Sequence, residues 1–322
     1  MATDSPPRPV TVARPLPWRR LARAELHRLL APRAARLTAV LLPVAVVAFG
    51  LSKLLLHDAD ASNAWHRAEE RYRQFQADVV EFGLPTSAGI GPRQFFDDPR
   101  YVMETLAFGD LRTLITALAA GAVLLGIFSG GTDWSSRVML TLSAAEPRRA
   151  RLFTTRALLV TGLSAAVTAA AGALLVPLLL VAAAFRGVPQ GLDGAFWAAL
   201  TSQLLRGVVL VGLLCLLGHA LATLTRRTSI ALALAFLYLA SAGRVFADRG
   251  PRLSEYDMSG LVFAVLNEKP VIPMERSDCF AGPGCEAAHV DLTAADGFVG
   301  VLLYLVPVLA LALWRSLRTD LG

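Results

Sequence analysis

The polar residues best suited to binding a partner lie in a short segment between two long apolar runs. The first run ends at residues 129–137, Ser-Gly-Gly-Thr-Asp-Trp-Ser-Ser-Arg, and the second begins after residues 146–151, Glu-Pro-Arg-Arg-Ala-Arg. An apolar helix of about 20 residues crosses the hydrocarbon core of a bilayer, so these runs predict a hairpin whose arginine-rich tip projects into the cytoplasm. The tip, residues 134–145, is expected to pack as a small helix against a partner. The residue types of this tip suit non-covalent binding to a partner.

Glu25 is a second residue whose position demands a partner. At helical spacing it lies between Leu21 and Leu29, on the apolar face of an expected interfacial helix. The opposite face carries Arg20, Arg23, His27 and Arg28, whose charges are available to lipid phosphates. A carboxylate on the apolar face needs a cation. Either an arginine of residues 137–151 pairs with it and locks the interfacial helix to the hairpin, or Arg28 pairs with it locally.

Residues with a potential for catalysis or ion transfer are few. The sequence contains no Gly-x-x-x-x-Gly-Lys-Ser/Thr loop for nucleotide phosphates and no His-Glu-x-x-His, Gly-x-Ser-x-Gly or paired Cys-x-x-Cys motif. Within the apolar runs, the ionisable candidates are Arg206 and His219, which fall on nearly opposite faces of one helix and do not form a pair. The sequence therefore predicts a non-catalytic membrane protein that binds no cofactor itself.

The two cysteines of an outer segment are candidates for a covalent or metal-binding role. Cys279 and Cys285 are separated by Phe-Ala-Gly-Pro-Gly. A flexible turn on the oxidising side of a membrane favours a disulfide. A metal site with His289 or Asp278 is the alternative, although the spacing matches no standard zinc pattern. The third cysteine, Cys215, is expected to be a small buried residue.

Composition places these residues in an all-α polytopic membrane protein. The chain has 322 residues, of which 55% are hydrophobic, and its mean hydropathy is +0.52. Uninterrupted apolar stretches predict six spans, at residues 37–56, 111–131, 154–184, 203–224, 228–247 and 297–314. Gly126 and Gly130 form a small-xxx-small step that allows close helix packing in the second span.

The charge distribution orients the spans. The N-terminus, residues 137–156, Arg226, Arg227 and the C-terminal tail carry most of the basic residues in short segments, which predicts that both termini are cytoplasmic. The 29 arginines against two lysines are typical of a GC-rich bacterial genome, so the expected location is a bacterial plasma membrane. Arginines spread over segments separated by membrane do not form a nucleic-acid site. The leading segment is too long for a signal peptide, which favours an uncleaved first span.

The resulting organisation places the functional segments at the two membrane surfaces. The predicted parts are a disordered tail at 1–15, a cytoplasmic interfacial helix at 16–36 and a transmembrane domain at 37–322, with outer segments at 57–110 and 248–296 and a cytoplasmic coupling segment at 132–151. In the first outer segment, helical spacing aligns Trp65, Ala68, Tyr72, Phe75, Val79 and Phe82. This pattern predicts an amphipathic helix with a packed aromatic stripe. Residues 260–266 are too short to cross and predict a re-entrant or surface helix.

These features together resemble the ABC-2 type permeases, the membrane subunits of bacterial ATP-binding-cassette exporters. Family members show an interfacial helix, six spans, large outer segments after spans one and five, and a span-two exit with an acidic residue, a short apolar helix and a Pro-Arg-Arg-like step. The corresponding residues here are Asp133 and Trp134, then Val138 to Leu142 including Leu140, then Pro147, Arg148 and Arg149. Two departures occur, since a frequent Gly-Thr step is replaced by Ser136 and Arg137, and a common lysine at the start of span three is Arg156.

The resemblance implies a motor-coupled exporter. Two permease chains, identical or paired with a sister chain, would form the substrate route, and two ATPase subunits, which hold ATP and Mg²⁺, would dock on the 132–151 segments. The arginines there would contact an acidic or polar groove, and Pro147 suits the first position of a helix. Asp133, Trp134, Arg137, Leu140, Pro147, Arg148 and Arg149 are the predicted contacts, with Glu25 as the lock.

Two other classes of protein compete with this interpretation. An ATPase-independent secondary carrier or channel is expected to show inverted repeats and midplane ionisable residues, and neither is clear in the sequence. A membrane scaffold or sensor would bind a ligand through its outer segments and relay the signal through the hairpin to a cytoplasmic partner.

Overall fold

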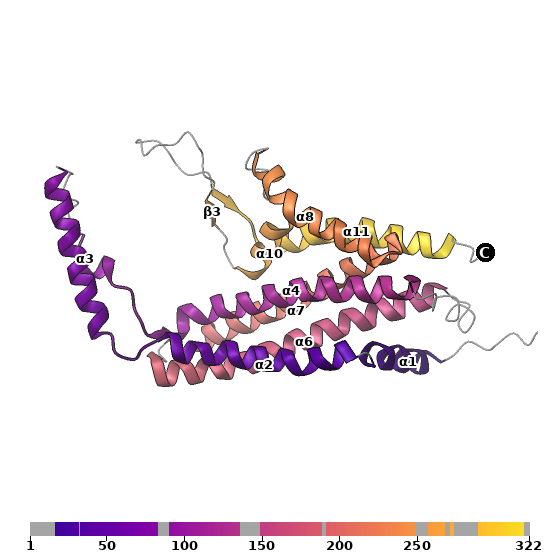
Figure 1. Cartoon of the computed structure of the whole chain (residues 1–322), viewed down its shortest axis with the longest axis horizontal. Coiled ribbons are helices and arrows are strands. Elements are labelled where there is room, and N and C mark those ends of the chain that lie inside the picture. Colours follow the sequence, from indigo (N-terminus) through magenta and orange to yellow (C-terminus); the bar gives the residue numbers. More distant parts are fainter. Residues whose placement is uncertain are drawn as a thin grey trace, which may run out of the picture. The chain divides into compact units, whose positions relative to one another are not determined.

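The computed structural model describes residues 17–31, 33–82, 90–135, 149–188, 191–248, 257–267, 271–273 and 289–318. The helices are α1 (Trp18–Leu30), α2 (Arg33–Leu56), α3 (Ser62–Glu81), the 3-10 helix η1 (Pro92–Phe95), α4 (Met103–Ser135), α6 (Arg149–Arg186), α7 (Gly194–Thr225), α8 (Thr228–Asp248), α10 (Met258–Leu266) and α11 (Ala294–Arg318). The strands are β1 (Tyr101–Val102), β2 (Gly187–Val188), β3 (Val271–Pro273) and β4 (His289–Asp291). Figure 1 labels the α-helices and β3 along the chain.

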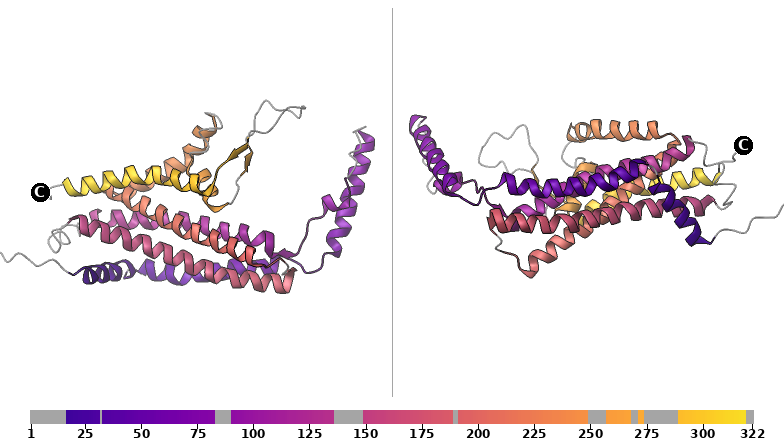
Figure 2. Two further views of the ribbon diagram at one scale, coloured as in Figure 1. Left: turned by 180° about the vertical axis from the view of Figure 1, so that it is seen from behind. Right: turned by 60° about the horizontal axis from the view of Figure 1, so that its bottom comes forward.

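The fold is that of an all-α polytopic membrane protein, as predicted. Five described helices are long and apolar enough to cross a bilayer: Ala35–Leu56, Met103–Gly131, Ala150–Arg186, Gly194–Thr225 and Ala294–Arg318. The apolar segment Thr228–Ser241 of α8 is shorter. Figure 2 shows α4, α6 and α7 as long continuous helices.

Contacts divide the chain into two compact units. One contains the described residues of Met1–Arg36, Ala119–Ala165 and Leu210–Gly322, and the other those of Leu37–Leu118 and Ala166–Val209. Helices α4, α6 and α7 therefore contribute residues to both units, and each unit has its own buried contacts.

In the first unit, glycines allow α4 and α7 to pack with their backbones close together. A Cβ added to Gly126 would overlap the carbonyl oxygen of Cys215, and one added to Gly130 would lie 2.6 Å from the carbonyl oxygen of His219. On the facing side, a Cβ at Gly218 would overlap the carbonyl oxygen of Val123. The small-xxx-small step predicted for the second span is confirmed as a site of close helix packing.

The short helix α10 packs against α11 in the same unit. Leu261, Ala264, Val265 and Leu266 are buried, and the Leu261 carbonyl oxygen would lie 2.8 Å from a Cβ at Gly297. Figure 1 shows α10 beside the start of α11. The prediction of a helix too short to cross the membrane is confirmed, since α10 has 9 residues.

In the second unit, α3 packs through its aromatic stripe, as predicted. Trp65 stacks on Phe96 with ring centroids 4.2 Å apart, and Tyr72 and Phe75 contact Phe95 at 6.0 and 5.5 Å. The stripe therefore forms the core of a small hairpin between α3 and η1. Phe82, at the end of the predicted stripe, is 70% exposed and does not belong to this core.

The helices extend beyond several predicted limits. Helix α4 begins at Met103, two turns before residue 111, and α7 begins at Gly194 instead of residue 203. Asp110 and the polar residues near the start of α7 had lowered the apparent hydropathy of these turns. The partly buried Lys53 on α2 compensates the charge of Asp110, and α4 continues through this position.

Candidate functional site

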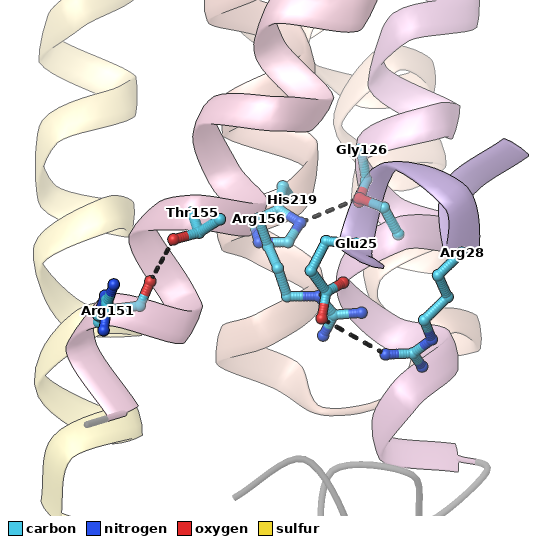
Figure 3. A network of polar contacts seen from close by, with 8 residues as sticks. Glu25, Arg28, Gly126, Arg151, Thr155, Arg156 and His219 are labelled. Atoms are coloured by element: carbon cyan, nitrogen blue, oxygen red, sulfur yellow. Dashed lines mark hydrogen bonds and ion pairs between the residues drawn. The ribbon is translucent and has the colours of Figure 1, made fainter. Parts of the chain in front are cut away.

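The first unit contains a buried ion pair that joins α1 to α6. Glu25 is 3% exposed and Arg156 is 7% exposed. The Arg156 Nε–H donates a hydrogen bond to Glu25 Oε2 at 3.1 Å, while Arg28 Nη1 lies 3.9 Å from Glu25 Oε1. Figure 3 shows the carboxylate of Glu25 facing the guanidinium of Arg156, with Arg28 on its other side.

The pairing partly agrees with the prediction for Glu25. The local Arg28 contact is present, but the closer partner is Arg156, which follows the predicted 137–151 partner range by about one helical turn. Arg156 lies two turns inside α6, which begins at Arg149. A charge left alone in such a buried position costs several kcal/mol, so the two side chains require each other. The pair therefore fixes α1 against the first turns of the third span.

A second polar contact lies close to this pair and joins α7 to α4. His219 is 2% exposed, and its Nδ1 lies 3.0 Å from Ser129 Oγ. Because the Ser129 hydroxyl donates to the Gly126 carbonyl oxygen at 2.8 Å, Nδ1–H is assigned as the donor to Ser129. Figure 3 shows His219 near Arg156. The ring centroids of Phe153 and His219 are 5.8 Å apart.

The arrangement is suited to holding helices in register. Glu25 and Arg156 join α1 to α6, His219 and Ser129 join α7 to α4, and the Phe153 ring on α6 contacts His219. Among the described residues, no group of three or more His, Cys, Asp or Glu side chains is arranged to hold a metal ion. The cluster therefore combines one buried ion pair with one buried hydrogen bond, and each of them joins two helices.

The predicted docking residues themselves fall mostly outside the described part of the chain. Residues 136–148, with Arg137, Leu140, Pro147 and Arg148, lie outside it. The backbones of Asp133 and Trp134 belong to the last turn of α4, and that of Arg149 begins α6. These docking contacts stay predictions.

The predicted disulfide also lies outside the described residues, with Cys279, Cys285 and Asp278. His289 begins β4, which pairs antiparallel with β3. Cys215 is buried, as predicted, and its Sγ lies 3.7 Å from the Val160 carbonyl oxygen.

The second unit contains a charged cluster that sequence reasoning missed. Lys53 Nζ on α2 lies 2.6 Å from Asp110 Oδ1 on α4, and the Tyr101 hydroxyl donates to Asp110 Oδ2 at 2.8 Å. Tyr101 is fully buried. The sequence did contain a signal for this cluster. Lys53 lies near the end of the first apolar run and Asp110 near the start of the second, and two helices that form a hairpin bring these ends together.

Neighbouring groups keep this cluster in place. The Lys53 ammonium lies 4.8 Å from the Phe49 ring centroid, and the His57 ring meets Tyr101 edge to face at 5.1 Å. Burial raises the pKa of the Tyr101 hydroxyl, and the hydrogen bond to Asp110 raises this pKa further, so the phenol remains a donor. Beside it, β1 pairs in parallel with β2 through Tyr101 and Gly187.

Removing one charge of this cluster should destabilise the second unit. We expect Lys53→Met to lower the free energy of unfolding by about 2 kcal/mol, because the largely buried Asp110 carboxylate would lose the cation that lies 2.6 Å from it. The charge exchange Lys53→Asp/Asp110→Lys should recover part of the loss. Arg73→Met, which breaks the exposed 3.7 Å contact with Glu69, is the control and should cost less than about 0.5 kcal/mol. Equal losses in Lys53→Met and Arg73→Met, measured by equilibrium unfolding in micelles, would contradict this interpretation.

Compared with known proteins, the chain matches no family model, no curated protein and no solved structure.

Proposed function

We propose that this chain is the membrane permease subunit of an ATP-binding-cassette transporter, an exporter of the ABC-2 type. Two permease chains form the substrate route, and two separate ATPase subunits bind ATP and Mg²⁺. The observation that carries the proposal is the Glu25–Arg156 ion pair, because it ties the interfacial helix α1 to the first turns of α6. Those turns come directly after the 132–151 segment on which the ATPase would dock.

The physical argument is one of transmission. A displacement of the segment between α4 and α6 acts on the first turns of α6, and a buried ion pair resists separation of Arg156 from Glu25. Helix α1 must then follow α6. On the other side of the segment, the close backbone packing of Gly126 and Gly130 makes α7 follow α4. Closure of the ATPases would in this way move whole helices.

The proposed location is the bacterial plasma membrane, with both termini in the cytoplasm. The long apolar helices require a bilayer, and the excess of arginine in the short segments at one end of the spans supports this orientation. The chain itself is proposed to be non-catalytic.

Co-purification tests the proposal directly. The full chain, co-expressed with its genomic neighbours and purified in mild detergent, should retain an ATPase. Asp133→Ala and the double variant Arg148→Glu/Arg149→Glu should lower ATPase retention by about tenfold, since each removes or reverses charges at the docking surface. The matched control is Arg71→Glu/Arg73→Glu on the exposed face of α3, which carries the same charge change. If the folded chain retains no ATPase, or if control and hairpin variants behave alike, the proposal fails.

One observation favours a secondary carrier as the second candidate. Asp110 and Lys53 form a charge pair on two membrane-spanning helices, and such residues commonly serve ion-coupled transport. A carrier would move its substrate in vesicles under an ion gradient without an ATPase, and Asp110→Asn would abolish that transport. ATP-dependent transport that persists in Asp110→Asn would exclude this candidate.

A further inference from the structure

The turn between α7 and α8 places an arginine in an unfavourable backbone conformation. Arg226 has a φ of 57°, a left-handed value that suits glycine or asparagine at the end of a helix. Its N–H donates to the Ala222 carbonyl oxygen at 2.8 Å, and the Thr225 hydroxyl lies 3.2 Å from the Arg227 carbonyl oxygen. Arg226 thus occupies the position that ends α7, where a glycine would adopt the same backbone conformation without strain. Backbone outliers of this kind cluster at functional sites.

A second arginine is held against the same turn from another helix. Arg315, in the last turn of α11, donates from Nη1 to the Leu224 carbonyl oxygen at 2.6 Å. Burial lowers the pKa of Arg226, and the Arg315 charge lowers this pKa further. Arg315 is thus held two residues from Arg226 along the same turn, and an anion at this turn would be attracted by both positive charges.

Two more arginines add positive charge near this turn, and a tryptophan indicates its depth in the membrane. Arg318 lies over the Trp314 ring at 4.9 Å, and Arg227 is exposed. Tryptophan is enriched at the boundary between hydrocarbon and headgroups, and Trp314 is 54% exposed. A tryptophan at the end of α11 favours a position of the cluster at headgroup level, where arginines meet phosphodiesters with bidentate geometry.

Exposed apolar side chains lie next to this cluster on both helices. Leu311 and Leu317 on α11 and Ile230 and Leu234 on α8 are exposed. They offer a surface along which acyl chains can pack, directly beside the arginines. Free phosphate would use the guanidiniums alone, whereas a phospholipid uses both surfaces.

We propose that Arg226, Arg227, Arg315 and Arg318 form a binding site for the headgroup phosphate of an anionic phospholipid. The lipid bridges the α7–α8 turn and the end of α11, and its chains lie against the apolar residues beside them. The site is independent of the proposed transport function, because it requires only that these helices end at a membrane surface.

Native mass spectrometry of the full-length protein in detergent, with added lipids, tests this site. Phosphatidylglycerol and cardiolipin should be retained at least tenfold more than phosphatidylcholine, while inorganic phosphate should not compete. Arg226→Gly should reduce this preference about fivefold, by loss of one charge near the lipid surface. Since glycine suits the left-handed backbone, this variant should keep its thermal unfolding midpoint, which separates loss of the site from loss of the fold.

Matched variants decide between a local site and a general charge effect. Arg315→Gln/Arg318→Gln should reduce the preference for anionic lipid by more than tenfold, by the loss of two such charges. Arg71→Gln/Arg73→Gln, with the same charge loss on α3, should leave it unchanged. Equal retention of phosphatidylcholine, competition by inorganic phosphate, an equal loss in the α3 control, or undiminished preference in Arg226→Gly would each overturn the proposal.

Discussion

Replacement of Glu25 by glutamine is expected to lower the free energy of unfolding by about 3 kcal/mol. Glutamine keeps the size of the side chain but removes its charge, so the buried guanidinium of Arg156 would lose its counter-ion. The Arg156 Nε–H donates to Glu25 at 3.1 Å, and both residues are buried. The loss should appear in equilibrium unfolding of the purified chain in mixed micelles.

Two further variants show whether the Arg156 contact carries this effect. Arg28→Gln removes the half-buried 3.9 Å contact with Glu25 and should cost about 1 kcal/mol or less. The double variant Glu25→Leu/Arg156→Met replaces both charges by apolar groups and should recover most of the stability. If Arg28→Gln cost as much as Glu25→Gln, the Arg156 contact would not be the dominant one.

The double variant also separates stability from transmission. If the pair transmits movement from the docked ATPase, the stable double variant should still retain the ATPase but should lose the stimulation of ATP hydrolysis by substrate. Unchanged stimulation in that variant would leave the pair with a structural role alone.

Replacement of Gly126 by alanine is expected to lower the free energy of unfolding by about 3 kcal/mol, at the upper end of the usual cost of overpacking. The new Cβ would meet the backbone of α7 at Cys215 and His219, which cannot move aside as a side chain can. Helices α4 and α7 would have to separate, and the contact between Ser129 and His219, at 3.0 Å, would be lost with them.

Another glycine on the same helix provides the control. A Cβ added to Gly121 meets nothing within 4 Å, so Gly121→Ala should be neutral or stabilising by up to about 1 kcal/mol. Thermal unfolding of both variants in the same detergent gives the comparison. Similar unfolding midpoints for Gly126→Ala and Gly121→Ala would contradict the close packing of α4 and α7.

The sequence by itself determined the class of protein and the local elements. Long apolar runs require helices in a bilayer, and the spacing of Trp65, Tyr72 and Phe75 requires an amphipathic helix with one aromatic face. The short apolar segment that became α10 and the close packing at Gly126 were also readable. All of these follow from the period and length of a single helix, which neighbouring residues specify.

The tertiary structure alone decided which charges meet. Glu25 signalled a need for a cation, but only the packing of α1 against α6 selected Arg156, 131 positions away in the chain. Asp110 looked like part of an outer segment until Lys53 on α2 was found beside it. The same compensation explains why α4 begins at Met103. A hydropathy scale assigns each charged residue the free-energy cost of burying it alone. The actual cost depends on the partner that another helix brings within hydrogen-bond distance.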